Sequence, residues 1–189
     1  MKNAMRIASI CMILWAGLAP SAHAADSKEV NEARSAIRKK SKEILNELYK
    51  VQPASKKAVA GSAGYAVFSN FGMKILVAGG GSGKGQAISG KKEVFMKMAE
   101  VQAGLGFGIK KTKLVFVFEK KSLWDDFVNS GWVASAQATA AAKSGDSGAA
   151  YQGAVAVAPG IWLYQLTDKG LALEMTVKGT KYYKDDDLN

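Results

Sequence analysis

Alternate glycines are the feature of this sequence that most restricts how the chain can fold. Two segments have glycine at every second position: Gly79, Gly81, Gly83 and Gly85 in the first, and Gly104, Gly106 and Gly108 in the second. Residues two apart share one face of a β-strand, so each segment would have one face without side chains. Such strands permit sharp bending or close approach of another backbone. The spacing predicts a tightly coiled sheet, or one pressed by a helix or a second layer of strands.

A phosphate-binding loop is the alternative interpretation of the first segment, which reads LVAGGGSGKGQ. A G-x-x-x-x-G-K-[ST] motif ending at Gly83-Lys84 would have Ala78 in place of its first glycine and Gly85 in place of its hydroxyl residue. The G-x-G-x-x-G pattern also fails. The following residues, QAISGKKEVF, read as strand, turn and strand, so no helix N-terminus is available for a phosphate. We therefore favour the interpretation that these glycines form the bare face of a strand, and not a phosphate-binding loop.

The rest of the chain beyond residue 64 also shows a period of two. Seven segments predict short strands: GYAVFS, MKILVAG, KEVFMKMAE, GLGFGIK, TKLVFVFE, IWLYQL and LALEMTVK. The segment WVASAQATAAAK is ambiguous, since its alanines favour helix while its alternating polar residues favour strand; we interpret it as a strand, followed by a turn in SGDSG. The predicted fold class is α+β, with a curved, mainly antiparallel, barrel-like sheet.

Two helices are expected outside this pattern. The first spans about residues 26–50, with Asp26 as its cap, an apolar stripe on one face and an end near Val51 before Pro53. The stripe consists of Val30, Ala33, Ile37, Ile44 and Leu48. The second helix is short, near Leu123 to Asn129, with Ser122 as its cap and Gly131 as its stop.

Residues 1–24 have the pattern of a secretory signal peptide. Two basic residues precede a short apolar run, and Ala22-His23-Ala24 forms an A-x-A cleavage site. A lipoprotein signal is the competing interpretation because Cys11 is present, but Cys11 lies inside the apolar run. We therefore expect cleavage between Ala24 and Ala25, a periplasmic or secreted location, and one mature domain over residues 25–189 whose sheet-rich core spans about 64–189.

The mature chain would contain neither cysteine nor histidine, because Cys11 and His23 are the only ones in the sequence. Thiol nucleophiles, disulfides and histidine-based acid–base catalysis are thereby excluded, as are the usual ligands of zinc, copper and haem. The acidic segment KDDDLN lacks the glycine and distal glutamate of a calcium loop, and nothing desolvates a Ser82–Lys84 pair for acyl chemistry. We expect no enzymatic activity, no metal and no cofactor.

A net charge of +10 favours anionic partners. Five basic residues beside the apolar stripe of the first helix are the predicted lipid contact: Arg34, Arg38, Lys39, Lys40 and Lys42. The alternative is a solvated face, since four glutamates lie on the same helix. The stripe is too small to serve both the sheet and a membrane, so we expect it to dock on the protein. Nucleic acid is not an expected partner outside the cytoplasm, and the charge could serve solubility alone.

Two further basic clusters occur in the predicted sheet. The secondary lipid-contact candidates are Lys110, Lys111 and Lys113, at a predicted strand–strand turn, and Lys91 with Lys92 form a third cluster. Lysines at turns are commonly solvated or protect strand edges from aggregation. Trp124, Trp132 and Trp162 could lie at a membrane interface, but a core position is the usual role of tryptophan near apolar neighbours.

Three blocks in this order resemble the SYLF domain family: GYAVFSNFGMKILVAGGGSGKGQAI, GLGFGIKKTKLVFVFEKKSLWDDF, and GLALEMTVKGTKYYKDDDLN. The resemblance covers roughly Ala58 to Asn189, including the closing Gly179 and Asn189. It implies lipid binding, which in eukaryotic members is directed to phosphoinositides in part through an amphipathic N-terminal helix, and some members bind actin filaments. For an exported bacterial member it implies anionic-lipid binding without phosphoinositide specificity or actin binding.

The sequence thus predicts non-enzymatic binding of anionic lipid at the bacterial envelope. The alternative is an envelope-structural or protein-binding role without lipid contact, with an unknown protein partner.

Overall fold

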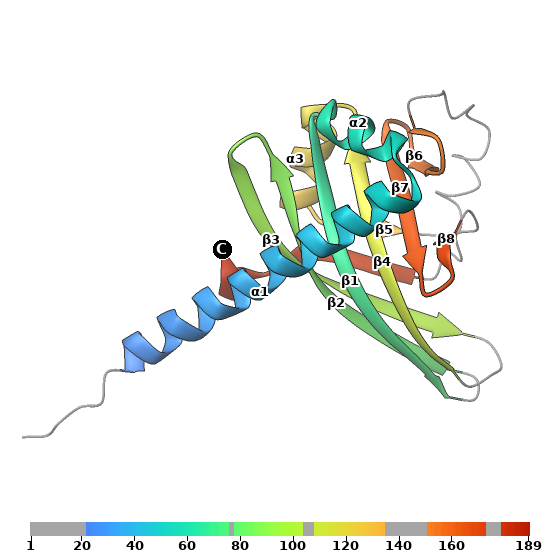
Figure 1. Cartoon of the computed structure of the whole chain (residues 1–189). Coiled ribbons are helices and arrows are strands. Elements are labelled where there is room, and N and C mark those ends of the chain that lie inside the picture. The colour runs from blue at the N-terminus through green and yellow to red at the C-terminus, as the bar shows by residue number, and fades with distance from the viewer. Residues whose placement is uncertain (1–21, 76–77, 104–107, 135–150, 173–178) are drawn as a thin grey trace, which may run out of the picture.

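The computed structural model describes residues 22–75, 78–103, 108–134, 151–172 and 179–189. Its helices are α1 (Ala22–Val51), α2 (Ala54–Ala60), α3 (Lys121–Asn129) and the 3-10 turn η2 (Asp186–Leu188). Nine strands form one antiparallel sheet: β1 (Gly64–Ile75), β2 (Ala78–Ser89), β3 (Lys92–Ala103), β4 (Gly108–Phe118), β5 (Trp132–Ala134), β6 (Val155–Ala158), β7 (Ile161–Thr167), β8 (Gly170–Ala172) and β9 (Gly179–Lys184). The α+β class with a curled antiparallel sheet and an N-terminal helix is confirmed (Figure 1).

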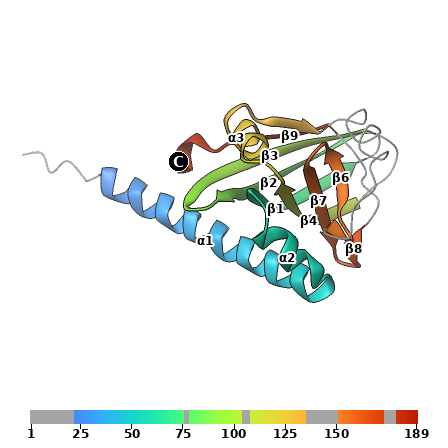
Figure 2. The same ribbon diagram turned by 90° about the horizontal axis from the view of Figure 1, so that it is seen from above.

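The sheet has the order β5-β9-β3-β2-β1-β4-β7-β6, with β8 paired to β7. Four long strands form its centre: β1, β2 and β3 pair in sequence order, and β4 pairs with the other side of β1. In Figure 2, α1 and α2 lie on one side of the curled sheet, and α3 lies on the other. We call these the outer and inner faces.

The first glycine segment forms the bend of β2, as its spacing predicts. Gly85 pairs with Phe68, and Gly83 with Asn70, so the glycines point to the inner face. A Cβ atom on Gly83 would lie 2.5 Å from the carbonyl oxygen of Ser69 and 2.8 Å from Cγ of Met98. The bare face therefore lets the neighbouring backbone approach more closely than any side chain would allow. Residues 104–107 of the second glycine segment lie outside the described residues.

The inner face and α3 form the main core. Trp124, Phe127 and Val128 of α3 are buried against sheet residues such as Phe68 and Phe116. A second cluster packs Ile44 and Leu48 of α1 on the outer face, over Val67 of β1 and the β4 and β7 side chains around Tyr164. Trp162 is also buried there, and Trp132 packs partly buried against the main core, so the three tryptophans have the predicted core role.

Several predicted boundaries were wrong. Helix α1 begins at Ala22, so Asp26 does not cap it; alanines before Asp26 favour the helical conformation and extend it. Helix α3 begins at Lys121 with Lys120 as its N-cap, which places Ser122 inside the helix. Gly131 does follow this helix with a φ of +71°. The predicted end near Val51 is confirmed, but α2 was not predicted, because a seven-residue helix is too short for a periodic apolar stripe.

The strand boundaries also differ. The segments MKILVAG and GLGFGIK were predicted as separate strands, but their described residues belong to the long strands β1, β2 and β4. Strands β6 and β9 were not predicted. Of the segment WVASAQATAAAK, Trp132–Ala134 is the strand β5, as interpreted, and the remainder lies with SGDSG outside the described residues.

A buried tyrosine in the outer cluster yields a stability prediction. Tyr164 is 0% exposed, and its hydroxyl has no hydrogen-bond partner among the residues that the structure describes. Burial raises the pKa of Tyr164 to about 12, whereas an unfolded tyrosine ionises near pH 10. The unfolded state thus loses this proton first, so the free energy of unfolding falls as pH rises from about 10 to 12.

We expect Tyr164→Phe to increase the free energy of unfolding at pH 7 by about 1 kcal/mol, because it removes an unsatisfied hydroxyl. The variant should also lose less stability than the parent between pH 10 and 12. Urea denaturation at pH 7 and pH 11 measures both, with the more exposed Tyr183→Phe as control. A destabilisation of about 1 kcal/mol at pH 7 would instead mean that the hydroxyl makes a favourable contact.

Candidate functional site

The two arginines of the predicted basic row bind to the protein itself. Arg34 donates from Nε to the carbonyl oxygen of Leu188 at 2.9 Å. Arg38 makes a bidentate ion pair with Glu93 of β3, with Nε 3.0 Å from Oε1 and Nη2 2.6 Å from Oε2. Both guanidinium groups also lie over the ring of Phe95, at 5.8 and 5.2 Å from its centroid. These contacts fix α1 to β3 and to the C-terminal segment.

The three lysines of the row have fewer contacts. Lys40 forms an exposed ion pair with Glu43 at 3.1 Å, a type of pair that contributes little to stability. Lys39 and Lys42 are exposed, and neither makes an ion pair with a described residue. The structure therefore divides the predicted row into two docking arginines and three lysines that remain accessible to an anionic partner.

The apolar stripe of α1 packs against the rest of the protein, as expected. Ile37 is 7% exposed, Ile44 1% and Leu48 0%. Ile37 packs with Phe95 and Leu188 near the arginines, and the other two belong to the cluster on the outer face. Because the stripe is covered, the accessible part of α1 can contribute charge to a ligand but little apolar surface.

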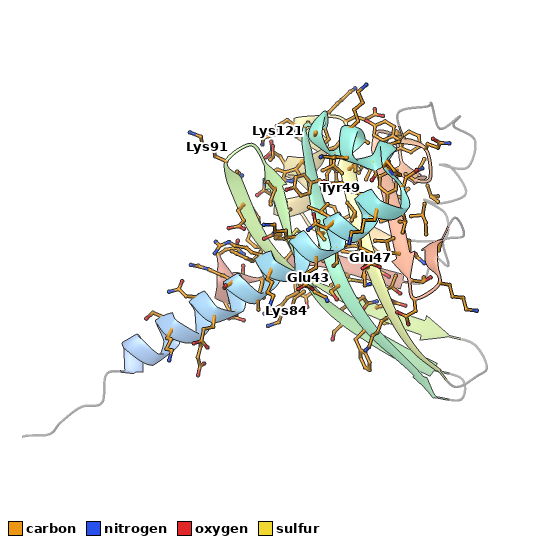
Figure 3. The ribbon with its side chains drawn as sticks, in the orientation of Figure 1. Glu43, Glu47, Tyr49, Lys84, Lys91 and Lys121 are labelled. Carbon is orange, nitrogen blue, oxygen red and sulfur yellow. The ribbon has the colours of Figure 1, made fainter. Side chains whose placement is uncertain are left out.

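A pocket of about 220 Å³ lies between α1 and the outer face of the sheet. Its walls are Ala33, Ala36, Ile37, Lys40, Ser41 and Ile44 of α1, with Ser69 of β1 and Lys84 of β2. Figure 3 shows Lys84 beside α1. Two ammonium groups, two hydroxyls and small apolar side chains make this pocket suited to an anionic group joined to a small apolar part.

Lys84 was considered in the sequence only as part of a phosphate loop or a Ser–Lys pair. It instead lies in a regular strand, and both Lys84 and Ser82 are exposed. The signal for its position was available: if the glycines of β2 face inward, then the alternate residues Ser82 and Lys84 must face outward.

The secondary cluster is not at a turn, contrary to the prediction, because all three lysines lie within β4 (Gly108–Phe118). Lys113 forms an ion pair with Glu47 of α1 at 2.7 Å, and Lys111 is exposed without an ion pair to a described residue. The side chain of Lys110 lies outside the described residues. The third cluster does include a turn residue, Lys91, while Lys92 lies over the ring of Trp124 at 5.3 Å.

The acidic C-terminal segment is held by a lysine. Nζ of Lys97 in β3 lies 2.7 Å from Oδ1 of buried Asp185 and 2.8 Å from Oδ2 of exposed Asp187. Hydrogen bonds to these carboxylates raise the pKa of Lys97, and the same contact lowers the pKa of Asp187. Lys97 is therefore committed to the fold. Within the described residues, no three His, Cys, Asp or Glu side chains are placed to share a metal ion.

The closing asparagine has a structural role. Asn189 accepts a hydrogen bond from the backbone N–H of Phe95 at 2.9 Å and donates to the carbonyl oxygen of Phe95 at 2.8 Å. A second donation reaches the carbonyl oxygen of Asp185 at 2.6 Å. Its amide thus continues the hydrogen bonding of β3 and holds the last turn beneath α1.

None of the described helices has the combination of length and apolar character needed to span a bilayer. No family model matches the chain. The chain is homologous to Beta cell expansion factor A from Aeromonas veronii. The two are 33% identical over 165 residues, a match that covers 85% of this chain and 60% of the relative. The chain therefore spans about 60% of the length of the curated relative that it matches.

Proposed function

We propose that this protein is a SYLF-type domain that binds anionic lipid at a membrane surface, without enzymatic activity. The observation that carries the proposal is a group of exposed lysines on α1 and on the adjoining outer face that make no ion pair with described residues; four of them are Lys39, Lys42, Lys84 and Lys111. The resemblance in three sequence blocks supports the family, and the homology to a bacterial protein is consistent with a bacterial envelope protein.

The binding would be mainly electrostatic, because the apolar stripe of α1 is buried. A lysine near an anionic bilayer contributes about 1 kcal/mol, so several together produce measurable partitioning. Charges in 0.15 M salt are screened over about 8 Å, compared with about 30 Å at 0.01 M. Binding should therefore require anionic lipid and weaken strongly as salt increases.

Liposome flotation tests this proposal. The protein is expressed with its complete sequence, so that any leader is removed as in the cell, and mixed with vesicles of neutral phosphatidylcholine or of phosphatidylcholine with 30% phosphatidylglycerol (about this fraction gives a strongly negative surface). We expect flotation only with the anionic vesicles and at least about a tenfold loss of partitioning between 0.01 and 0.15 M salt.

Absence of flotation with either vesicle would refute lipid binding and favour the alternative role in envelope structure or protein binding. Equal flotation with both vesicles would refute the electrostatic mechanism. The relative's name describes an effect on beta cells and no chemical activity, so these measurements on the protein itself decide between the alternatives.

A further inference from the structure

Among the described residues, no element covers the part of the outer face that continues beyond α1 (Figure 1). In Figure 1 the long strands β1, β2 and β4 extend past the helix. Along β1, Ser69 lines the pocket under α1, and Phe71, two residues further, lies on the same face. Pairing then aligns Phe71 with Lys111 of β4 on one side and with Ser82 of β2 on the other. These neighbouring strands thus present one row of side chains outward, next to the helix.

We call this region the open sheet face. It consists of Phe71, Ser82, Lys84, Ala99, Val101 and Lys111. Ser82 pairs with Ala99 of β3, and Val101 follows two residues later on the same face. Lys84 borders both this face and the pocket, so the two are continuous.

Two large apolar side chains of this face are exposed to solvent. Phe71 is 49% exposed and Val101 71%, whereas the apolar residues of β1 and β3 nearer to α3, such as Phe68 and Met96, are fully buried. Phe71 and Val101 lie on strands that are separated only by β2. Such grouped apolar exposure, bordered by polar residues, is typical of a protein- or membrane-binding surface.

The charge on the same face has one sign. Lys84 and Lys111 are exposed and form no ion pair with described residues, and no acidic residue belongs to the open sheet face. Three carboxylates near its border are already engaged, Glu47 by Lys113 and both Asp185 and Asp187 by Lys97; the charge of Lys84 also lowers the pKa of Asp187. The acidic residue on β3 next to Val101 is Glu100, which accepts a hydrogen bond from Asn70 on the inner side of the sheet.

We propose that the open sheet face is the surface that contacts an anionic bilayer. The inference rests on the proposed lipid binding and assigns its location to the sheet, in place of the helix row predicted from the sequence. Lys84 and Lys111 bind lipid phosphates, and Phe71 and Val101 enter the interfacial region. An anionic bilayer fits better than an acidic protein because it satisfies the cations and the flanking apolar groups together, without a shaped partner surface. The accessible lysines of α1, by contrast, have a buried apolar stripe beside them.

Three charge-matched double variants locate the contact, each compared with the parent in the flotation assay. Lys84→Gln with Lys111→Gln removes two charges from the open sheet face. Lys39→Gln with Lys42→Gln removes two from the rival helix surface, and Lys56→Gln with Lys57→Gln removes two exposed charges from α2. We expect partitioning to fall about tenfold or more for the sheet pair, less than about threefold for the helix pair, and least for the α2 pair.

The outcomes separate the two claims. If the parent does not float with anionic vesicles, the proposed function fails. If the parent floats and the helix pair loses as much partitioning as the sheet pair, or more, the function stands and the location on the sheet is refuted. Equal losses in all three pairs would likewise refute a localised contact.

A direct contact measurement removes any dependence on charge variants. Phe71→Cys and Asn129→Cys each supply one exposed position for an environment-sensitive fluorophore, in a chain whose only natural cysteine, Cys11, lies in the predicted leader. Asn129 is the last residue of α3, which lies on the inner face of the sheet (Figure 2). Anionic vesicles should increase and blue-shift the emission of the label at position 71 and leave that at position 129 nearly unchanged. An unchanged signal at position 71, with the labelled protein floating, would overturn the proposal.

Discussion

Replacing Gly85 with alanine should destabilise the protein by about 3 kcal/mol or more, near the upper end of the cost of overpacking a core. The added Cβ would overlap the carbonyl oxygen of Val67 and lie 2.5 Å from Cδ1 of the Phe68 ring. The carbonyl belongs to the paired strand β1 and the ring is fully buried, so neither can move without displacing the sheet. Valine at this position should prevent folding, because its two methyl groups add to the same overlap.

A second glycine of β2 provides the matched control. Gly80 is exposed, and a Cβ there would meet its nearest neighbour, the carbonyl oxygen of Glu100, at 3.4 Å. Gly80→Ala should therefore change the free energy of unfolding by no more than about 0.5 kcal/mol. Urea denaturation of both variants gives the comparison. If the two substitutions had equal effects, the inward glycines would not be required for the bend of β2.

The glycine spacing shows how much of the fold is encoded locally. Period two placed a strand over Gly79 to Gly85, and that strand is present with its bare face turned inward, where the backbone is most crowded. The apolar stripe of α1 likewise predicted a docked helix, since a stripe with this period can be buried only against another element. Both signals depend on residues within one element, so the sequence is sufficient to detect them.

The partners of the charged residues could not be found in the same way. Arg38 and Glu93 are 55 positions apart, and Lys113 and Glu47 are 66 apart. The sequence around an arginine does not show whether its side chain will bind another part of the protein or face a ligand. The position of α1 over the sheet determines which of the two occurs. The exposure of Phe71 was not predicted either, because Phe71 lies between the two predicted segments GYAVFS and MKILVAG, and the helix covers only part of the single strand that they form (Figure 1).

Replacing Lys97 with methionine should cost about 3 kcal/mol. The substitution keeps the length of the side chain and removes the only cation that contacts the Asp185 carboxylate among the described residues. Asp185 is 1% exposed, and its charge is compensated by Nζ of Lys97, which lies 2.7 Å from Oδ1. An unpaired buried charge of this kind typically costs 3–5 kcal/mol, and the partial exposure of Lys97 places the effect at the lower end.

The second carboxylate that Lys97 contacts, Asp187, tests whether the loss of stability comes from the burial of an unpaired charge or from the loss of an ion pair alone. The Asp187 side chain is 82% exposed, and Asp187→Asn should change stability by less than about 1 kcal/mol, since exposed pairs contribute little. Combining Lys97→Met with Asp185→Leu should recover most of the loss, because the buried charge is removed together with its partner. Urea denaturation of the three variants at pH 7 measures these differences. If the double variant were no more stable than Lys97→Met alone, the cost would come from the packing of the lysine stem and not from a stranded carboxylate.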